Sequence, residues 1–141
     1  SDLVTLTKVP YESLPQKEHL TLATVFGSYD IMDLVINFNR TSDKYHIDLK
    51  DYYEMTGGSD VMDAITKLNT EIMAGNVPDI IDLTELPYSQ LAAKGLLEDL
   101  YPYIDADPEL DRDDFFPNVL SAYELDGGLY AAVPGLYKPE N

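Results

Sequence analysis

Segments typical of β-strands alternate with segments typical of α-helices from residue 19 onward, and this order limits the possible folds more than any other feature. Residues 19–26 are mostly apolar and rich in β-forming side chains, which is typical of a strand buried on both faces. Residues 45–53 alternate between apolar and polar side chains, and residues 78–83 form a short apolar segment that opens with proline. This alternation predicts an α/β fold with a mostly parallel sheet, helices on both faces and right-handed crossovers.

The segments between the strands carry apolar stripes at helical spacing. The stripes are Ile31, Leu34, Val35 and Phe38 in the first segment and Val61, Ile65, Leu68 and Ile72 in the second. Ser28 is placed to cap the first helix, and either Ser59 or Asp60 the second. Gly75 stands where a helix C-terminal glycine belongs, and a third helix is expected over residues 87–95.

The two ends of the chain have a different character from this alternating region. Residues 1–18 carry two prolines and alternate weakly, so we interpret them as a linker or lead-in. After the third helix, residues 97–104 are apolar with tyrosines, and residues 105–114 are expected to form an acidic, solvated loop. A short helix is expected at 115–122 and a hairpin at 123–133, turning on its Asp-Gly-Gly sequence.

The charge of the chain excludes several classes of partner. There are 26 acidic and 9 basic residues, a formal net charge of −17. Such a surface repels phosphate backbones and anionic lipid, so we expect no nucleic-acid binding and no peripheral membrane binding. Cysteine is absent, which excludes disulfides and thiolate metal sites. The sequence shows neither a signal segment nor an apolar run long enough to span a membrane.

Two loops are the candidate binding segments, because ligands of open parallel sheets collect beyond the carboxyl ends of the strands. They are residues 26–30 (FGSYD) after the first strand and residues 83–88 (LTELPY) after the third. Each combines an aromatic ring with hydroxyl or carboxylate groups, a mixture that suits a polyhydroxylated ligand. A second interpretation stays open, in which Phe26 and Tyr88 belong to the core and Asp30 and Glu85 favour helix starts.

Signatures of cofactor and metal binding are missing from the sequence. The loop at residues 26–28 lacks the further glycines of a dinucleotide site, and no Gly-Lys-Ser/Thr triplet occurs. In the acidic segment, Leu110 and Phe116 stand where a calcium-binding EF-hand needs glycine and glutamate. His19 and His46 show no paired ligand spacing. We therefore expect no cofactor, no metal and no catalytic residues.

Three passages of the sequence are more specific than the general pattern. They are residues 72–81 (IMAGNVPDII), 91–105 (LAAKGLLEDLYPYID) and 126–134 (DGGLYAAVP). In this order and spacing they resemble family-one extracellular solute-binding proteins, the maltose-binding-protein-like group, whose passages read A-G-x-x-P-D-I/V, A-x-x-G-L-L-x-D-L-x-x-Y-I and D-G-K-x-Y-A-V-P. The resemblance covers about residues 19–136.

The resemblance implies an extracellular, lipid-anchored or periplasmic protein that captures a small solute and delivers it to the membrane subunits of an ABC importer. A sugar or oligosaccharide is the first expectation for the solute. Residues 19–136 would form an incomplete N-terminal lobe, with 137–141 starting the crossover to a second lobe, and self-association of such a chain is expected. The ligand-binding residues carried over are Phe26, Gly27, Ser28, Tyr29, Asp30, Tyr53, Thr84, Glu85, Tyr88 and Tyr137.

Two other classes of function fit a parallel α/β sheet. A hydrolase-like domain would need a Gly-x-Ser-x-Gly nucleophile elbow, which does not occur. An α/β protein-interaction module of the receiver kind would need an aspartate at one strand end and a lysine at a later one. Asp82 is available for the first role, but no lysine follows on a buried strand. The fold alone does not rank these functions. The ranking rests on the three passages, which favour solute binding.

Overall fold

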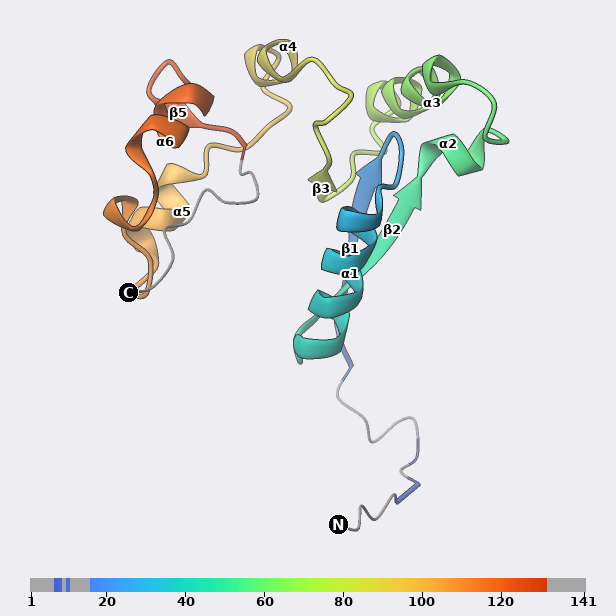
Figure 1. Ribbon diagram of the computed structural model, residues 1–141, viewed down its shortest axis with the longest axis horizontal. Coiled ribbons are helices and arrows are strands. Elements are labelled where there is room, and N and C mark those ends of the chain that lie inside the picture. Colours follow the sequence, from blue (N-terminus) through green and yellow to red (C-terminus); the bar gives the residue numbers. More distant parts are fainter. Residues whose placement is uncertain (1–6, 9, 11–15, 132–141) are drawn as a thin grey trace. The chain divides into compact units, whose positions relative to one another are not determined.

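The computed structural model describes residues 7–8, 10 and 16–131. The backbone divides into two compact units, Ser1–Glu85 and Leu86–Asn141, which are called the first unit and the second unit. Figure 1 shows both units and labels most of their helices and strands. Over the described ranges, no helix combines the length and the apolar character that crossing a membrane requires.

A parallel sheet forms the centre of the first unit (Figure 1). Within the described part of the chain its strands stand in the order β2 (Tyr45–Asp51), β1 (Glu18–Thr24) and β3 (Ile80–Ile81). Both outer strands run parallel to β1, with His46 opposite His19 and Ile80 opposite Leu22. Parallel neighbours need a crossover connection, and helices supply it after β1 and after β2. The predicted parallel α/β sheet is confirmed, although β3 is shorter than the predicted strand at 78–83.

Helix α1 (Tyr29–Thr41) covers one face of this sheet. The core on this side consists of Leu22, Val35 and Ile47, with Ile31, Phe38 and Leu49 packed against it. Ser28 caps the helix as predicted, because its hydroxyl oxygen accepts the N–H of Ile31 at 3.3 Å. Leu34 was wrongly included in the buried stripe, since its side chain is 55% exposed. At about 100° per residue it lies about 60° from Ile31, at the margin of the buried face.

Strand β2 ends two residues earlier than the sequence predicted. Residues 52 and 53 belong instead to the short helix α2 (Tyr52–Met55). Asp51 causes this change, because its carboxylate accepts the N–H of Glu54 at 3.2 Å and so caps the helix start. The backbone N–H of Tyr53 is donated to the carbonyl of Val25 at 2.9 Å, which holds α2 against the end of β1.

Helix α3 (Val61–Met73) follows the expected pattern. It begins at Asp60, whose carboxylate accepts the N–H of Met62 at 2.8 Å, and it ends before Gly75, which has a φ of 91°. Its buried residues are Ala64, Leu68 and Ile72. Near its C-terminal end, Glu71 lines a pocket together with Thr21 and Lys50. These two strand residues alternate with Leu22 and Leu49, so α3 approaches the sheet face opposite α1.

Tyr52 connects α2 to α3 from a buried position. Its side chain is 1% exposed, and its hydroxyl donates a hydrogen bond to the carboxylate of Glu71. Burial, followed by the hydrogen bond to Glu71, raises the pKa of Tyr52 to about 12. The phenol therefore stays neutral at pH values at which an exposed tyrosine is already ionised.

We expect the ring-carbon NMR signal of Tyr52 to titrate with a midpoint near pH 12. In the unfolded chain this phenol ionises at about pH 10. Because the folded-state pKa is the higher one, the stability that the neutral phenol contributes is complete below about pH 10 and is lost as the pH rises toward about 12. In Glu71→Gln the midpoint should fall but stay above that of an exposed tyrosine, because burial remains. A midpoint near that of free tyrosine in the unaltered protein would contradict this packing.

The second unit is built from short elements around a small core. They are α4 (Tyr88–Ala93), α5 (Tyr101–Ala106), the 3₁₀ helix η2 (Arg112–Asp114), α6 (Pro117–Tyr123), β4 (Glu124–Leu125) and β5 (Gly128–Leu129). The core consists of Tyr101, Ile104, Phe115, Leu120 and Leu129. Strands β4 and β5 pair antiparallel, and Asp126 and Gly127 between them have φ angles of 50° and 81°. Positive φ at both positions is typical of a type I′ hairpin turn, so the predicted hairpin is confirmed.

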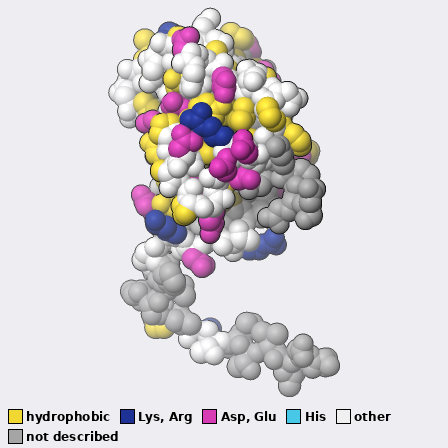
Figure 2. Space-filling model, turned by 90° about the vertical axis from the view of Figure 1, so that its left-hand side faces the viewer, with side chains coloured by type: hydrophobic (Ala, Val, Ile, Leu, Met, Phe, Trp, Pro, Cys, Tyr) yellow, Lys and Arg dark blue, Asp and Glu magenta, His cyan; other side chains and the backbone are white. Residues whose placement is uncertain are grey.

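The acidic segment at residues 105–114 is more ordered than a solvated loop. Asp105 lies in α5 and accepts two hydrogen bonds from the guanidinium of Arg112, at 2.8 and 2.7 Å. The same guanidinium lies over the ring of Tyr101, 3.7 Å from its centroid. On the face drawn in Figure 2, acidic side chains are interspersed with hydrophobic ones.

Candidate ligand-binding site

The carboxyl ends of the three parallel strands gather polar side chains at one edge of the sheet. Thr24 ends β1 and stands opposite Asp51, the last residue of β2. Asp82 follows β3, and its backbone N–H is donated to the carbonyl of Ala23 at 2.8 Å. Because the strands are parallel and in register, these side chains leave the sheet at the same edge. This edge is the position at which open α/β sheets bind ligands.

Thr24 and Asp82 form a fixed polar pair at the centre of this edge. Thr24 is fully buried, and its hydroxyl donates to Asp82 Oδ2 at 2.8 Å, with the carbonyl oxygen of Phe26 a second acceptor at 3.0 Å. The other oxygen, Asp82 Oδ1, accepts the hydroxyl of Thr84 at 2.6 Å and its N–H at 3.1 Å. The carboxylate is therefore held from two sides, and it ties the loop after β3 to the end of β1.

Asp51 connects the end of β2 to the loop after β1 in a similar way. Its Oδ2 accepts the N–H of Gly27 at 2.9 Å, while Oδ1 accepts the N–H of Glu54. A Cβ atom at residue 27 would lie 2.6 Å from Asp51 Oδ2. Real Cβ atoms do not approach an oxygen so closely, so a larger residue at this position would force the Asp51 carboxylate to move.

An exposed aromatic ring stands at the rim of this edge. The side chain of Phe26 is 52% exposed, and its ring meets that of Tyr53 edge-on, with 5.2 Å between the centroids and 70° between the planes. Tyr53 is half-buried and supports Phe26 from one side. About half of the Phe26 side chain is therefore accessible to pack against the apolar face of a ligand.

The structure brings five of the predicted ligand-binding residues to this edge of the first unit. They are Phe26, Gly27, Ser28, Tyr53 and Thr84. The hydroxyl of Ser28 is engaged in capping α1. Tyr29 is 88% exposed and begins α1 with the exposed Asp30 behind it, while Glu85 is exposed at the end of the first unit.

The other two predicted residues are not part of the described first unit. Tyr88 belongs to the second unit, where its hydroxyl donates to the carbonyl of Tyr123 and the two rings meet edge-on at 6.1 Å. Burial raises the pKa of the Tyr88 hydroxyl above its ordinary value. Tyr137 lies outside the described residues.

Sequence reasoning missed the residues that organise the edge, namely Thr24, Asp51 and Asp82. Asp82 was considered only as the aspartate of a receiver-like module. A signal was present, since each of these polar side chains is the last residue of a strand or follows it directly. Asp51 was not recognised as a strand end, because the predicted strand continued to residue 53.

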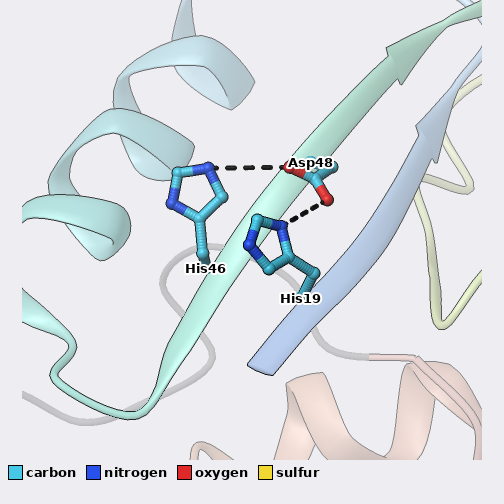
Figure 3. A group of neighbouring side chains, drawn as sticks. All are labelled: His19, His46 and Asp48. Atoms are coloured by element: carbon cyan, nitrogen blue, oxygen red, sulfur yellow. Dashed lines mark hydrogen bonds and ion pairs between the residues drawn. The ribbon is translucent and has the colours of Figure 1, made fainter. Parts of the chain in front are cut away.

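One group of side chains in the described part of the chain could hold a metal ion. The ligand atoms of His19, His46 and Asp48 all lie within 4.8 Å of one another (Figure 3). The spacing in the sequence gave no sign of this group, because the two histidines meet across neighbouring strands. The group lies toward the amino ends of β1 and β2, at the opposite end of the sheet from the ligand-binding edge.

The parallel α/β sheet of the first unit, with polar and aromatic side chains at its carboxyl ends, is consistent with the periplasmic-binding-protein fold. The family model described as bacterial extracellular solute-binding protein matches residues 51–140. The chain therefore belongs to the family of bacterial extracellular solute-binding proteins. The expected family resemblance is confirmed.

Solved structures show the same fold. An ABC substrate-binding protein from Listeria monocytogenes, in complex with cycloalternan, is similar at 24% identity and a TM-score of 0.62, over 81% of this chain and 28% of its own. An extracellular solute-binding protein of family 1 from Alicyclobacillus acidocaldarius is similar at 25% identity and a TM-score of 0.57, over 80% and 27%. The sugar-binding protein MalE from Xanthomonas citri is similar at 24% identity and a TM-score of 0.58, over 80% and 27%.

The chain thus spans 27–28% of the length of these solved proteins. A comparison with curated proteins found no match. At this level of identity the structural likeness shows the fold, and the family match shows membership of the solute-binding family.

Proposed function

We propose that this chain contributes to the binding site of an extracellular protein that captures a sugar or oligosaccharide and delivers it to the membrane subunits of an ABC importer. The family match supports capture of a solute. The structural relatives support a carbohydrate, because one is a sugar-binding protein and another was solved with cycloalternan. The proposed role is binding without chemical change of the ligand.

The observation that carries the proposal is the exposed ring of Phe26 beside the fixed carboxylates of the same edge. A sugar presents apolar C–H faces together with hydroxyl groups. The exposed part of the Phe26 side chain suits the former, and carboxylate oxygens at Asp51 and Asp82 suit the latter, since charge-assisted hydrogen bonds are strong. All ten predicted residues stay proposals as ligand contacts, namely Phe26, Gly27, Ser28, Tyr29, Asp30, Tyr53, Thr84, Glu85, Tyr88 and Tyr137.

The proposal also covers organisation and location. Residues 19–136 would belong to the N-terminal lobe, preceded by a lead-in at 1–18 and followed by a crossover that starts at 137–141. The protein would work outside the cell membrane, either in a periplasm or attached by a lipid anchor.

Self-association stays a prediction. It is supported by exposed apolar side chains on α1, such as Leu34 and Ile36, which are 55% and 62% exposed.

An NMR titration of the ¹⁵N-labelled chain tests the proposal, because it detects binding even in the millimolar range. Two amides report on the carboxylates directly: Gly27 N–H, which is donated to Asp51, and Thr84 N–H, which is donated to Asp82. We expect both signals to shift and saturate with glucose, maltose, maltotriose or cycloalternan. The Leu129 N–H, which is donated to Asp99 at 3.0 Å in the second unit, is a matched control.

Each outcome of this titration bears on the proposal. A saturable shift of the Gly27 and Thr84 amides, with a smaller response at Leu129, supports sugar binding at this edge. Shifts produced by glutamate or a dipeptide, while every carbohydrate leaves both amides unmoved, would contradict the sugar assignment. Recovery of the unchanged sugar after incubation is expected for a binding protein, and its hydrolysis would contradict a purely binding role.

A further inference from the structure

We propose that His19, His46 and Asp48 form a binding site for a divalent transition-metal ion, with zinc as the best fit. The site would join β1 to β2 near their amino ends. Two imidazoles and one carboxylate are ligands that zinc binds in proteins, with solvent completing the coordination. No part of this site coincides with the proposed sugar site, because His19 lies five residues before Thr24 on β1, roughly 16 Å along an extended strand.

The register of the sheet places the two histidines side by side. His19 of β1 is directly opposite His46 of β2, and the centroids of their rings are 5.0 Å apart. Asp48 lies two residues after His46, so its side chain leaves the strand on the same face. Its Oδ2 is 2.8 Å from His19 Nδ1, and its Oδ1 is 3.6 Å from His46 Nε2. Dashed lines in Figure 3 mark both contacts. The carboxylate thus already faces one nitrogen of each imidazole.

The separations of the ligand atoms allow an ion to be held with small side-chain rotations. Zinc bonds of about 2.0–2.1 Å in a tetrahedron place ligand atoms about 3.3 Å apart. The three ligand atoms now lie within 4.8 Å of one another. No separation therefore has to close by more than about 1.5 Å, which the rotations of exposed side chains can supply without moving the strands. The side chains of His19, His46 and Asp48 are 63%, 39% and 51% exposed, so an ion can enter from solvent.

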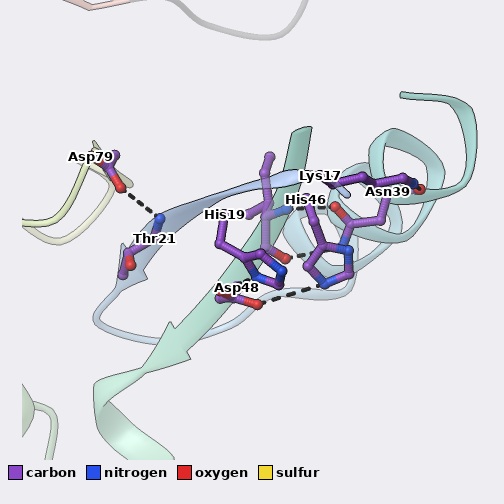
Figure 4. A network of polar contacts seen from close by, with 8 residues as sticks. Lys17, His19, Thr21, Asn39, His46, Asp48 and Asp79 are labelled. Carbon is purple, nitrogen blue, oxygen red and sulfur yellow. Dashed lines mark hydrogen bonds and ion pairs between the residues drawn. The ribbon is translucent and has the colours of Figure 1, made fainter. Parts of the chain in front are cut away.

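The backbone that carries these ligands is fixed by hydrogen bonds from outside the group (Figure 4). Ile47, between His46 and Asp48, donates its N–H to Asn39 Oδ1 at 2.6 Å and accepts from Asn39 Nδ2 at 3.0 Å. On β1, the N–H of Thr21 is donated to Asp79 Oδ2 at 2.9 Å. These bonds fix the backbone positions from which the three side chains extend, so only the side chains lose conformational freedom when an ion binds.

The net charge of the chain also favours a cation. The chain has a formal net charge of −17, and Asp48 brings a carboxylate into the group itself. The ammonium of Lys17 is engaged with the carbonyl oxygen of Asn39 at 2.9 Å. Lys50, the next residue of β2 on this face, lines a separate pocket with Glu71. A bound ion would connect two strands through three side chains and stabilise their pairing.

The test is a titration of the metal-free chain with zinc chloride, in competition with a chromophoric zinc indicator. We expect one saturable site per chain. Each of His19→Gln, His46→Gln and Asp48→Asn should weaken it by at least about tenfold, the loss that even an outer-shell change causes in metal sites. Asp33→Asn is the matched control, because Asp33 is exposed on α1 and its loss changes the charge by the same amount.

The histidine ring protons give a second readout that needs no variant. At saturating zinc, the ring signals of both His19 and His46 should shift in the unaltered protein. If both stay unmoved, the proposal is wrong. It is also overturned if Asp33→Asn weakens zinc binding as much as Asp48→Asn does, because zinc would then be attracted by diffuse negative charge rather than held by these three side chains.

Discussion

Replacing Phe26 with alanine is expected to weaken sugar binding by at least about tenfold, about 1.4 kcal/mol, if the edge of the sheet is the proposed site. The exposed ring supplies the apolar surface on which a sugar packs, and alanine removes it. Phe26→Tyr should keep most of the affinity because it keeps the ring, whereas Phe26→Leu should not. The measurement is the dissociation constant from the NMR titration of the Gly27 and Thr84 amides.

A control separates the ring at the edge from exposed rings in general. Phe116, in the second unit, is 38% exposed, so Phe116→Ala removes a comparable surface ring. It should leave the affinity unchanged. Because Phe26 is 52% exposed, its loss should also change the free energy of unfolding far less than the loss of a core residue. Equal effects of Phe26→Ala and Phe116→Ala on affinity would exclude Phe26 from the site.

The second large effect is expected on stability, from Leu68→Ala in helix α3. Leu68 is fully buried, and replacing a buried leucine with alanine removes transfer energy and leaves a cavity. The free energy of unfolding should fall by about 2–5 kcal/mol. Hydrogen exchange of the Leu22 and Ala23 amides in β1, together with urea unfolding, measures the change within the first unit.

Met73 provides the control within the same helix. Its side chain is 88% exposed, so Met73→Ala should change the free energy of unfolding by about 0.5 kcal/mol or less. A loss below about 1 kcal/mol for Leu68→Ala would mean that α3 does not pack through this residue, because fully buried leucines cost more than that.

Local sequence signals predicted much of the secondary structure. The cap of α1 at Ser28, the end of α3 before Gly75 and the hairpin at Asp126 and Gly127 were all predicted correctly. Each depends on a few neighbouring residues whose side chains or φ angles favour one conformation. The same local reasoning was wrong at residues 52 and 53, because alternation continues through them while the Asp51 cap starts a helix.

The binding edge was predicted less completely than the fold. The loops at 26–30 and 83–88 were predicted from the rule that ligands collect beyond the carboxyl ends of parallel strands. The contacts that shape the edge depend on pairing between distant segments. Thr24 and Asp82 are 58 residues apart in the sequence, and the carboxylate of Asp51 meets the N–H of Gly27 from 24 residues away. No short stretch of sequence predicts contacts between residues so far apart.

Residue patterns alone predicted the main alternation of strands and helices, although not α2, and they also showed the acidic character of the chain and its family. The tertiary structure decided which side chains meet. His19 and Asp48 are 29 residues apart, and they became neighbours of His46 because β1 and β2 pair in one register. A shift of that register by a single residue would turn the side chains of one strand to the opposite face. Register is fixed by the whole buried face of a strand, so it follows from the packed structure rather than from any short stretch of sequence.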